Sequence, residues 1–330
     1  MRKLSGKILA FSSILLAATP VVAFQRALQD GDFQTAISKV PIAVVAPASG
    51  VSQAQLNTLR KNLPPNVHFA SSYPNVTFHS NTDLKRAQEF TSALNDTHVD
   101  VIWAIEGRYG AARLLPALQN LHKPDKRKLF IGYSDNTFMH LLFNKWGWQS
   151  IHGPAMIETL NPKKDGESFI RMAKVLSGKT PVLQYEGLKP LNQAARAQVS
   201  IEGEIIGGNL TIVTKSIGTP WQINAYQRIL FLEDVFSDGE TVDRDLTHLK
   251  QAGRLKNVRA VLLGAFMHGD ETVNYAIKRF AEETNIPVYQ TNLFGHGPQN
   301  FPLPFGCKSK IQSASGHANS YGLTIESPKL

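Results

Sequence analysis

The sequence predicts an α/β protein with a parallel sheet in its first half and a β-rich second half. Between Val40 and Trp146, short apolar runs alternate with helix-length segments, which is typical of βαβ units. From about Val182 the pattern changes to loosely alternating, glycine-containing segments, which indicates turn-rich β-structure. A chain of 330 residues can form two domains, each with its own core. We predict domains at 38–165 and 182–330.

In the first half, apolar runs predict strands, and apolar residues at helical spacing or N-cap candidates predict helices. The predicted strands are 40–46, 67–71, 99–105 and 129–133, and the predicted helices are 53–63, 83–93, 110–121, 136–146 and 166–176.

In the second half, the segment 198–213 is predicted to be β-structure. It is followed by strands 228–235, 258–266 and 286–291 and by helices 242–251 and 271–284. Short apolar alternations after Lys308 predict edge strands.

Residues 1–23 have the pattern of a secretory signal peptide. Arg2, Lys3 and Lys7 precede the apolar run 8–22, and Val21-Val22-Ala23 offers a small-residue cleavage site. The run is short for a membrane span and contains two Ser and a Pro. We expect cleavage near Ala23, export to the periplasm or medium, and no stable membrane insertion.

The net charge is +9, from 35 Lys and Arg against 26 Asp and Glu. Three of the cations belong to the predicted signal peptide. The other basic residues are dispersed and do not alternate with aromatic residues, so we expect no nucleic-acid partner. The charge suits either an anionic surface such as cell wall or an ordinary solvated surface. The single Cys307 excludes an intramolecular disulfide and a cysteine-based metal cluster.

Ser134 lies in a sequence that resembles a nucleophile elbow. The apolar run 129–132 ends at a glycine, Ser134 follows two residues later, and a helix-like segment begins at once. A sharp strand-to-helix turn of this kind exposes a serine hydroxyl above a sheet. Asn136 occupies the position of the second glycine in G-x-S-x-G, so an ordinary turn is the alternative.

Small-residue turns also follow two other predicted strands, at 47–50 and 106–110. Functional groups of parallel sheets collect at the carboxyl ends of the strands. We therefore expect these two turns to converge with the turn 132–136.

A serine nucleophile needs a base, and the base needs a partner that fixes its tautomer. His296, flanked by glycines at the end of an apolar segment, is the preferred base, with His152 and His268 as rivals. Glu233 and Asp234 end an apolar strand, and because side chains alternate along a strand, one of the two should face the site. No metal-binding motif is present, so we expect no metal and no organic cofactor.

Short motifs over nearly all of the mature chain resemble, in order and spacing, those of the LD-carboxypeptidase family of serine peptidases. This family includes muropeptide carboxypeptidases and microcin C immunity peptidases. The motifs are V-A-P-A-S (45–49), Y-G-A-A-R-L-L (109–115), I-G-Y-S-D (131–135), H-G-P (152–154), G-G-N-L (207–210), G-T-P (218–220), L-F-L-E-D-V (230–235), V-D-R (242–244), G-H-G (295–297) and P-L-P-F-G (302–306).

The resemblance implies a Ser-His-Glu triad of Ser134, His296 and Glu233. It also implies oxyanion donors from the backbone N–H of Asp135 and from Gly107 in the turn 106–110. It further implies a flavodoxin-like N-terminal domain with the nucleophile, a smaller β-rich C-terminal domain with the Glu and His, and a homodimer.

The turn 106–110 departs from the family pattern. The family usually reads Arg-Gly-Gly-Tyr-Gly, whereas this chain reads Glu106-Gly107-Arg108-Tyr109-Gly110. Arg108 must therefore adopt the backbone conformation that the second glycine allowed, with strain if its φ is positive. Arg108 either binds a substrate carboxylate or points to solvent, and Arg113 and Arg244 are further candidates for that carboxylate.

The resemblance and the predicted export imply a muropeptide LD-carboxypeptidase. Such an enzyme removes the terminal D-alanine from peptidoglycan tetrapeptides, and its partners are peptidoglycan stem peptides. One alternative keeps the triad but acts on a peptidyl nucleotide, as the immunity peptidases do. The other is a non-catalytic muropeptide-binding protein, because of the altered turn. The predicted signal peptide favours the wall substrate.

Overall fold

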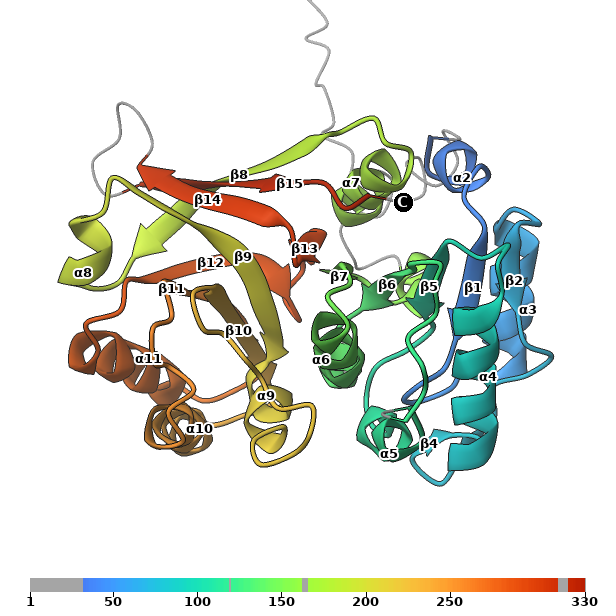
Figure 1. Cartoon of the computed structure of the whole chain (residues 1–330), viewed down its shortest axis with the longest axis horizontal. Coiled ribbons are helices and arrows are strands. Elements are labelled where there is room, and N and C mark those ends of the chain that lie inside the picture. The colour runs from blue at the N-terminus through green and yellow to red at the C-terminus, as the bar shows by residue number, and fades with distance from the viewer. Residues whose placement is uncertain (1–31, 119, 162–165, 314–319, 330) are drawn as a thin grey trace, which may run out of the picture.

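The computed structural model describes residues 32–329 except 119, 162–165 and 314–319. The predicted signal peptide at 1–23 lies outside the described residues. Figure 1 shows two halves side by side, with a sheet flanked by helices on the right and a barrel with its helices on the left.

The first half contains a flavodoxin-like sheet. Its parallel strands are β1 (Ile42–Val45), β2 (Val67–Phe69), β5 (Val101–Ala104), β6 (Leu129–Gly132) and β7 (Ser150–His152). Their order across the sheet is β2-β1-β5-β6-β7. Counted along the chain this is 2-1-3-4-5, the flavodoxin order. The prediction of a parallel α/β sheet with this topology is confirmed.

Helices follow the strands, and α3 and α4 begin after side-chain N-caps. Ser52 forms a capping box with Gln55, and the Thr82 hydroxyl accepts a hydrogen bond from the Lys85 N–H. The helical elements are α2 (Asp32–Ile37), α3 (Gln53–Asn62), α4 (Asp83–Asn95), η1 (Ala111–Leu114), α5 (Leu115–Leu118), η2 (Ser134–Asn136), α6 (Thr137–Lys145), η3 (Met156–Leu160) and α7 (Gly166–Leu176). A small hairpin of β3 (Asn75–Val76) and β4 (His79–Ser80) precedes α4.

The second half is a closed barrel in the order β10-β11-β12-β8-β15-β14-β9. Its strands are β8 (Val182–Pro190), β9 (Ser200–Asn209), β10 (Ile229–Val235), β11 (Ala260–Met267), β12 (Val288–Gly295), β14 (Lys308–Ser313) and β15 (Tyr321–Glu326). Its helices are α8 (Gln193–Arg196), α9 (Leu210–Lys215), α10 (Gly239–Gln251) and α11 (Thr272–Glu283).

Two predictions for the second half are wrong. The strands after Lys308 are not edge strands, because β14 pairs with both β15 and β9, and β15 pairs with both β14 and β8. Barrel closure removes the edges. Residues 210–213 are helical because Asn209 caps α9, its side-chain oxygen accepting from the Ile212 N–H.

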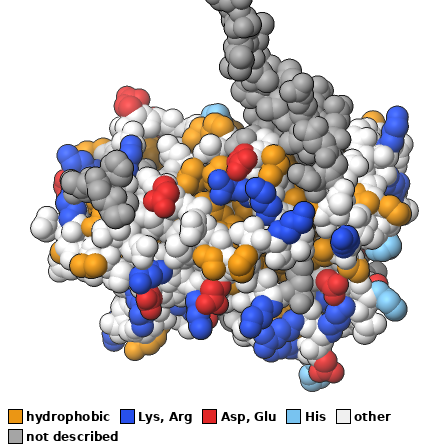
Figure 2. Space-filling view, turned by 90° about the horizontal axis from the view of Figure 1, so that it is seen from above, with side chains coloured by type: hydrophobic (Ala, Val, Ile, Leu, Met, Phe, Trp, Pro, Cys, Tyr) orange, Lys and Arg blue, Asp and Glu red, His pale blue; other side chains and the backbone are white. Residues whose placement is uncertain are grey.

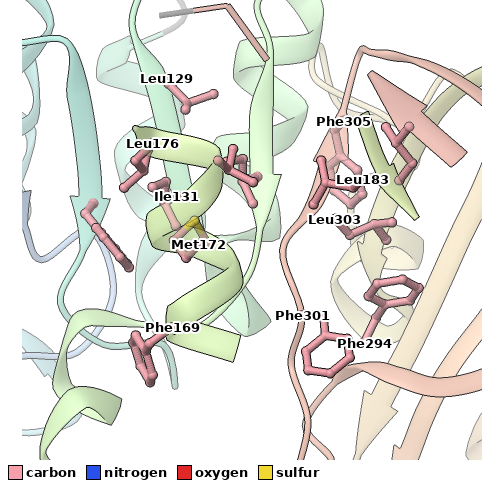
Figure 3. Close-up of a cluster of buried hydrophobic side chains, with 14 of the residues drawn as sticks. Leu129, Ile131, Phe169, Met172, Leu176, Leu183, Phe294, Phe301, Leu303 and Phe305 are labelled. Atoms are coloured by element: carbon pink, nitrogen blue, oxygen red, sulfur yellow. The ribbon is translucent and has the colours of Figure 1, made fainter. Parts of the chain in front are cut away.

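One strand from the second half joins the first sheet. β13 (Leu303–Phe305) pairs antiparallel with β7, so the chain crosses back between the two halves. Leu303 and Phe305 belong to an apolar cluster that also includes Met172 of α7 and Phe294 of β12. Figure 3 shows these side chains on both sides of the crossing. A continuous apolar core therefore holds the two halves together.

Charged side chains on the face shown in Figure 2 form separate small groups, with basic and acidic residues interspersed. Among the described residues, no helix is long and apolar enough to cross a membrane.

Candidate active site

The turn at Ser134 has the geometry of a nucleophile elbow. Strand β6 ends at Gly132, Ser134 has φ +61°, and α6 begins at Thr137. A serine with positive φ is uncommon, and such strain is concentrated at functional turns. The Ser134 side chain is half-buried, whereas the residues on either side of it are buried.

The three predicted turns converge around Ser134, as expected. The Ser49 N–H donates to the Gly107 carbonyl at 3.0 Å, and Asn136 Nδ2 donates to the Glu106 carbonyl at 3.0 Å. A methyl group on Gly107 would lie 2.9 Å from Ser134 Cβ and 3.3 Å from Ser134 Oγ. Glycine is therefore needed at 107 for the close approach of this turn to the nucleophile.

Arg86, which the sequence analysis did not identify, links two of these turns. Its buried guanidinium donates to the carbonyls of Pro47 and Gly110 and pairs with Asp83 at 2.5 Å. Asp83 also pairs with Arg113 at 2.6 Å, so Arg113 has a structural role in the described fold. In the sequence, Arg86 looks like an ordinary charged residue near the start of a helix, so nothing there indicated this role.

Asp135 anchors the turn 106–110 through its side chain. Its Oδ2 accepts from the Ala111 N–H at 2.7 Å. Burial raises the pKa of Asp135 to about 6, although hydrogen bonds from the backbone of Ala111 and Gly110 oppose the rise. The carboxyl group of Asp135 thus matters to the site in addition to the backbone N–H that we predicted.

His296 and Glu233 meet at the end of the barrel. Glu233 is fully buried near the end of β10, and His296 follows the last residue of β12. His296 Nδ1 donates to Glu233 Oε2 at 2.6 Å, a charge-assisted distance. A side chain at Gly295, where φ is +107°, would lie 2.8 Å from that oxygen. The glycine before His296 is therefore required for the pair.

Glu233 and Asp234 lie on opposite faces of β10, as strand alternation predicts, and their hydrogen-bond partners show that Glu233 is the one that faces His296. Asp234 faces away from His296, because its Oδ1 accepts from Asn209 Nδ2 at 3.0 Å and its Oδ2 from the Thr211 hydroxyl at 2.9 Å. The pairing of β10 with β11 is irregular at Glu233, because its register shifts between Leu232 and Asp234.

The ionisation of Glu233 is set by two histidines. Burial opposes its negative charge, but His296 and then His152 favour that charge and lower the pKa of Glu233 to about 2. His152 Nε2 lies 3.8 Å from Glu233 Oε1, and both side chains are fully buried. This distance exceeds a hydrogen bond, and neither atom has a hydrogen-bond partner among the described residues. His152 therefore acts on Glu233 electrostatically, without a hydrogen bond.

The predicted nucleophile and the predicted base come from different halves, which meet at Tyr133 and His296. The Tyr133 ring, next to Ser134 in the chain, lies 4.7 Å from the His296 ring. The Tyr133 hydroxyl donates to Glu158 Oε1 at 2.8 Å, which holds the ring in place. At the other end of the interface, the Asn209 N–H donates to the Thr137 hydroxyl at 3.0 Å, and Asn209 is the β-sheet partner of Glu233.

The rival bases have other environments. His152 is buried behind Glu233, as described above. His268 is exposed at the end of β11 and stacks on Phe236 at 5.1 Å. His140, on α6, lies against the Gly132 carbonyl and the Ser150 hydroxyl, and burial lowers its pKa to about 3.

The unusual residues of the turn lie beside the nucleophile. Arg108 has φ +74°, so the strain expected from the missing glycine is present. Its side chain is 76% exposed, and its Nε is 4.0 Å from Glu106 Oε2. Glu106 Oε1 accepts from the Gly107 N–H at 3.0 Å, the donor that we predicted for the oxyanion. Among the described residues, no group of three or more His, Cys, Asp or Glu side chains could hold a metal ion.

Comparison with known proteins identifies both halves. Residues 42–153 match the model of the LD-carboxypeptidase N-terminal domain, and residues 202–311 match that of the C-terminal domain. A putative carboxypeptidase of Rickettsia conorii is 39% identical over 279 residues, covering 83% of this chain and 89% of the relative. The microcin C7 self-immunity protein of Escherichia coli is 29% identical over 265 residues, covering 71% and 77%.

Similarity to solved structures agrees with these family matches. The crystal structure of muramoyltetrapeptide carboxypeptidase from Oxalobacter formigenes has a TM-score of 0.71 at 25% identity, covering 88% of this chain and 99% of that one. Fold and family matches together define a two-domain, serine-type carboxypeptidase, a hydrolase of peptide bonds. The chain belongs to the LD-carboxypeptidase family.

Proposed function

We propose that this protein is a muropeptide LD-carboxypeptidase with the triad Ser134, His296 and Glu233. It would hydrolyse the bond between the L-centre of the diamino acid and the terminal D-alanine of peptidoglycan tetrapeptides. The observation that supports this best is the buried 2.6 Å Glu233–His296 pair, which lies beside the strained Ser134 turn. Similarity to muramoyltetrapeptide carboxypeptidase supports the substrate class.

In the proposed reaction, Ser134 Oγ attacks the carbonyl carbon of the diamino acid while His296 Nε2 accepts the hydroxyl proton. Glu233 accepts from Nδ1–H, which fixes the tautomer and stabilises the imidazolium. The oxyanion is stabilised by backbone N–H groups, for which we propose Asp135 and Gly107. His296 then protonates the amine of D-alanine, which leaves. Water, deprotonated by His296, hydrolyses the acyl-enzyme and regenerates Ser134.

An exopeptidase also has to bind the carboxylate of the terminal D-alanine. We propose Arg108 for this role, because its guanidinium is largely exposed and the adjacent Gly107 leaves no room for a side chain beside Ser134. Its strained φ, in a position that glycine usually fills, is consistent with a functional constraint.

A peptidyl nucleotide is the second candidate substrate, because the chain is also similar to the microcin C7 self-immunity protein. The same triad would cleave it. Mass spectrometry of a disaccharide tetrapeptide and of a peptidyl nucleotide, each before and after incubation, distinguishes the two. We expect loss of one D-alanine from the tetrapeptide. No change in the tetrapeptide with cleavage of the nucleotide would contradict the proposal.

We further propose that the protein is exported after cleavage near Ala23 and acts on the wall in place as a homodimer. The n-region, apolar run and cleavage site in residues 1–23 support export, and family resemblance supports the dimer. N-terminal sequencing of the extracytoplasmic protein should begin after Ala23, and light scattering should give twice the chain mass. An intact N-terminus or a monomer would contradict the respective proposal.

A further inference from the structure

A polar pocket lies beside the nucleophile, at the switch point of the first sheet. The chain leaves β1 toward β2 on one side, whereas β5, on the other side of β1, leads toward β6 and β7. Ligands of such sheets bind where the strand order reverses. A cavity of about 460 Å³ opens at this point, with Ser52, Gln55 and Asn75 in one wall and Glu106 and Arg108 in the other.

Glu106 gives this pocket a negative charge. Its side chain is 24% exposed, with Oε1 on the Gly107 N–H and Oε2 at 4.0 Å from Arg108 Nε. Burial raises the pKa of Glu106, while the Gly107 hydrogen bond and then Arg108 oppose the rise. An exposed pair at 4.0 Å is worth no more than about 1 kcal/mol, so Arg108 competes only weakly for this carboxylate.

The position of Glu106 conflicts with the chemistry of the site. The Gly107 N–H cannot donate to a developing oxyanion while it donates to Glu106, and a carboxylate close to that oxyanion would repel it. For the reaction to proceed, the carboxylate must turn toward another donor in the pocket. An ammonium group of the substrate supplies both the donor and the neutralising charge.

We propose that Glu106 binds the free side-chain ammonium group of the diamino acid whose carbonyl Ser134 attacks. Cleavage is thereby restricted to stem peptides whose side-chain amine is not acylated, that is, to stems without a crosslink at that amine. This inference rests on the proposed function. The attacked residue has a long side chain ending in an amine. This side chain must pass the turn 106–108, because Gly107 lies so close to Ser134 that a Cβ at 107 would be 3.3 Å from Ser134 Oγ. Acylation removes the charge and adds bulk.

Two synthetic tetrapeptides test the inference: L-Ala-γ-D-Glu-L-Lys-D-Ala with a free side-chain amine, and the same peptide with that amine acetylated. D-Alanine release gives kcat/KM for each. We expect wild type to favour the free amine by about ten- to a hundredfold, the effect of one close charge pair. In Glu106→Gln this preference should fall to about threefold or less, because kcat/KM falls for the peptide with the free amine and rises for the acetylated peptide.

A matched control is Glu282→Gln, which removes an exposed carboxylate of α11 and should leave the ratio unchanged. A wild-type ratio near one, or a Glu106→Gln ratio equal to that of wild type, would overturn the inference while leaving the proposed function intact. Cleavage of neither peptide would overturn the proposed function. The inference is then decided by calorimetric affinities of the two peptides for Ser134→Ala, with and without Glu106→Gln. Equal affinities in Ser134→Ala would overturn it, and a preference for the free amine that Glu106→Gln abolishes would support it.

Discussion

The two walls of the active site stabilise their functional groups in opposite ways. The wall from the first half consists of turns, in which Ser134 and Arg108 have positive φ. Hydrogen bonds accepted by Asp135 and donated by Asn136 and Arg86 hold these turns together. The wall from the barrel consists of a buried hydrogen-bonded pair, with Glu233 fully buried and accepting from His296 Nδ1 at 2.6 Å. Backbone strain positions Ser134, the proposed nucleophile, whereas burial and a hydrogen bond position His296, the proposed base.

This difference explains which positions of the site can accept other residues. Glu233 is fully buried with Gly295 and His152 beside it, so few substitutions fit around the pair Glu233–His296. The turn 106–108 is open to a pocket and tolerates both a new carboxylate and a strained arginine. Substrate preference is therefore expected to vary on the strained wall, and the catalytic pair to stay fixed on the buried wall.

The largest effect is expected on the buried wall. Glu233→Gln should lower kcat for tetrapeptide cleavage by about 10³–10⁴-fold, because the amide cannot stabilise the His296 imidazolium or fix its tautomer. Asp234→Asn is the control, since Asp234 lies on the other face of β10 and binds Asn209. We expect it to lose less than about tenfold. Equal losses in both variants would show that strand integrity, and not the pair, determines the rate.

A pH-dependent effect on stability is expected from the strained wall. The folded pKa of Asp135 is raised to about 6, so the folded state binds the proton more tightly than the unfolded state. Relative to Asp135→Asn, wild type should therefore lose about 3 kcal/mol of unfolding free energy as the pH rises from about 4 to about 6. Urea unfolding of both proteins at several pH values measures this. A constant difference across that window would contradict the buried, anchoring role of Asp135.

The buried wall should also depend on His152. His152→Leu should lower kcat by about ten- to a hundredfold, because Glu233 loses the neighbour at 3.8 Å that favours its charged form. His268→Asn, at an exposed strand end, is the control and should change kcat less than twofold. If His152→Leu keeps the wild-type rate with an unchanged unfolding midpoint, His152 has only a packing role.

The smallest effect concerns strain in the turn. Arg108→Gly should raise the unfolding free energy by about 1 kcal/mol, since relief of the positive φ outweighs the entropy cost of glycine. The same variant should raise KM for the tetrapeptide, because it removes the proposed carboxylate ligand. Arg108→Lys keeps the charge and the strain, so its stability should equal that of wild type. A less stable Arg108→Gly would show that Arg108 is not strained.

The sequence predicted regular elements and the convergence of the turns better than the contacts around them. Strand β6, helix α7 and the convergence of three turns follow from apolar runs and from the geometry of parallel sheets. The choice of Glu233 over Asp234, the inward position of His152 and the role of Arg86 depend on three-dimensional neighbours. Barrel closure by β14 and β15 was also missed, because short alternating segments look the same at an edge and inside a barrel.

Labelling of Ser134 by a fluorophosphonate probe tests the central claim most directly, that a nucleophile on one wall is activated by a base on the other. Peptide mapping of the labelled wild-type protein should show one modified residue, Ser134. Labelling should be absent in Ser134→Ala and slowed at least about a hundredfold in Glu233→Gln. Unchanged labelling of Ser134→Ala, or equal rates in wild type and Glu233→Gln, would contradict the account.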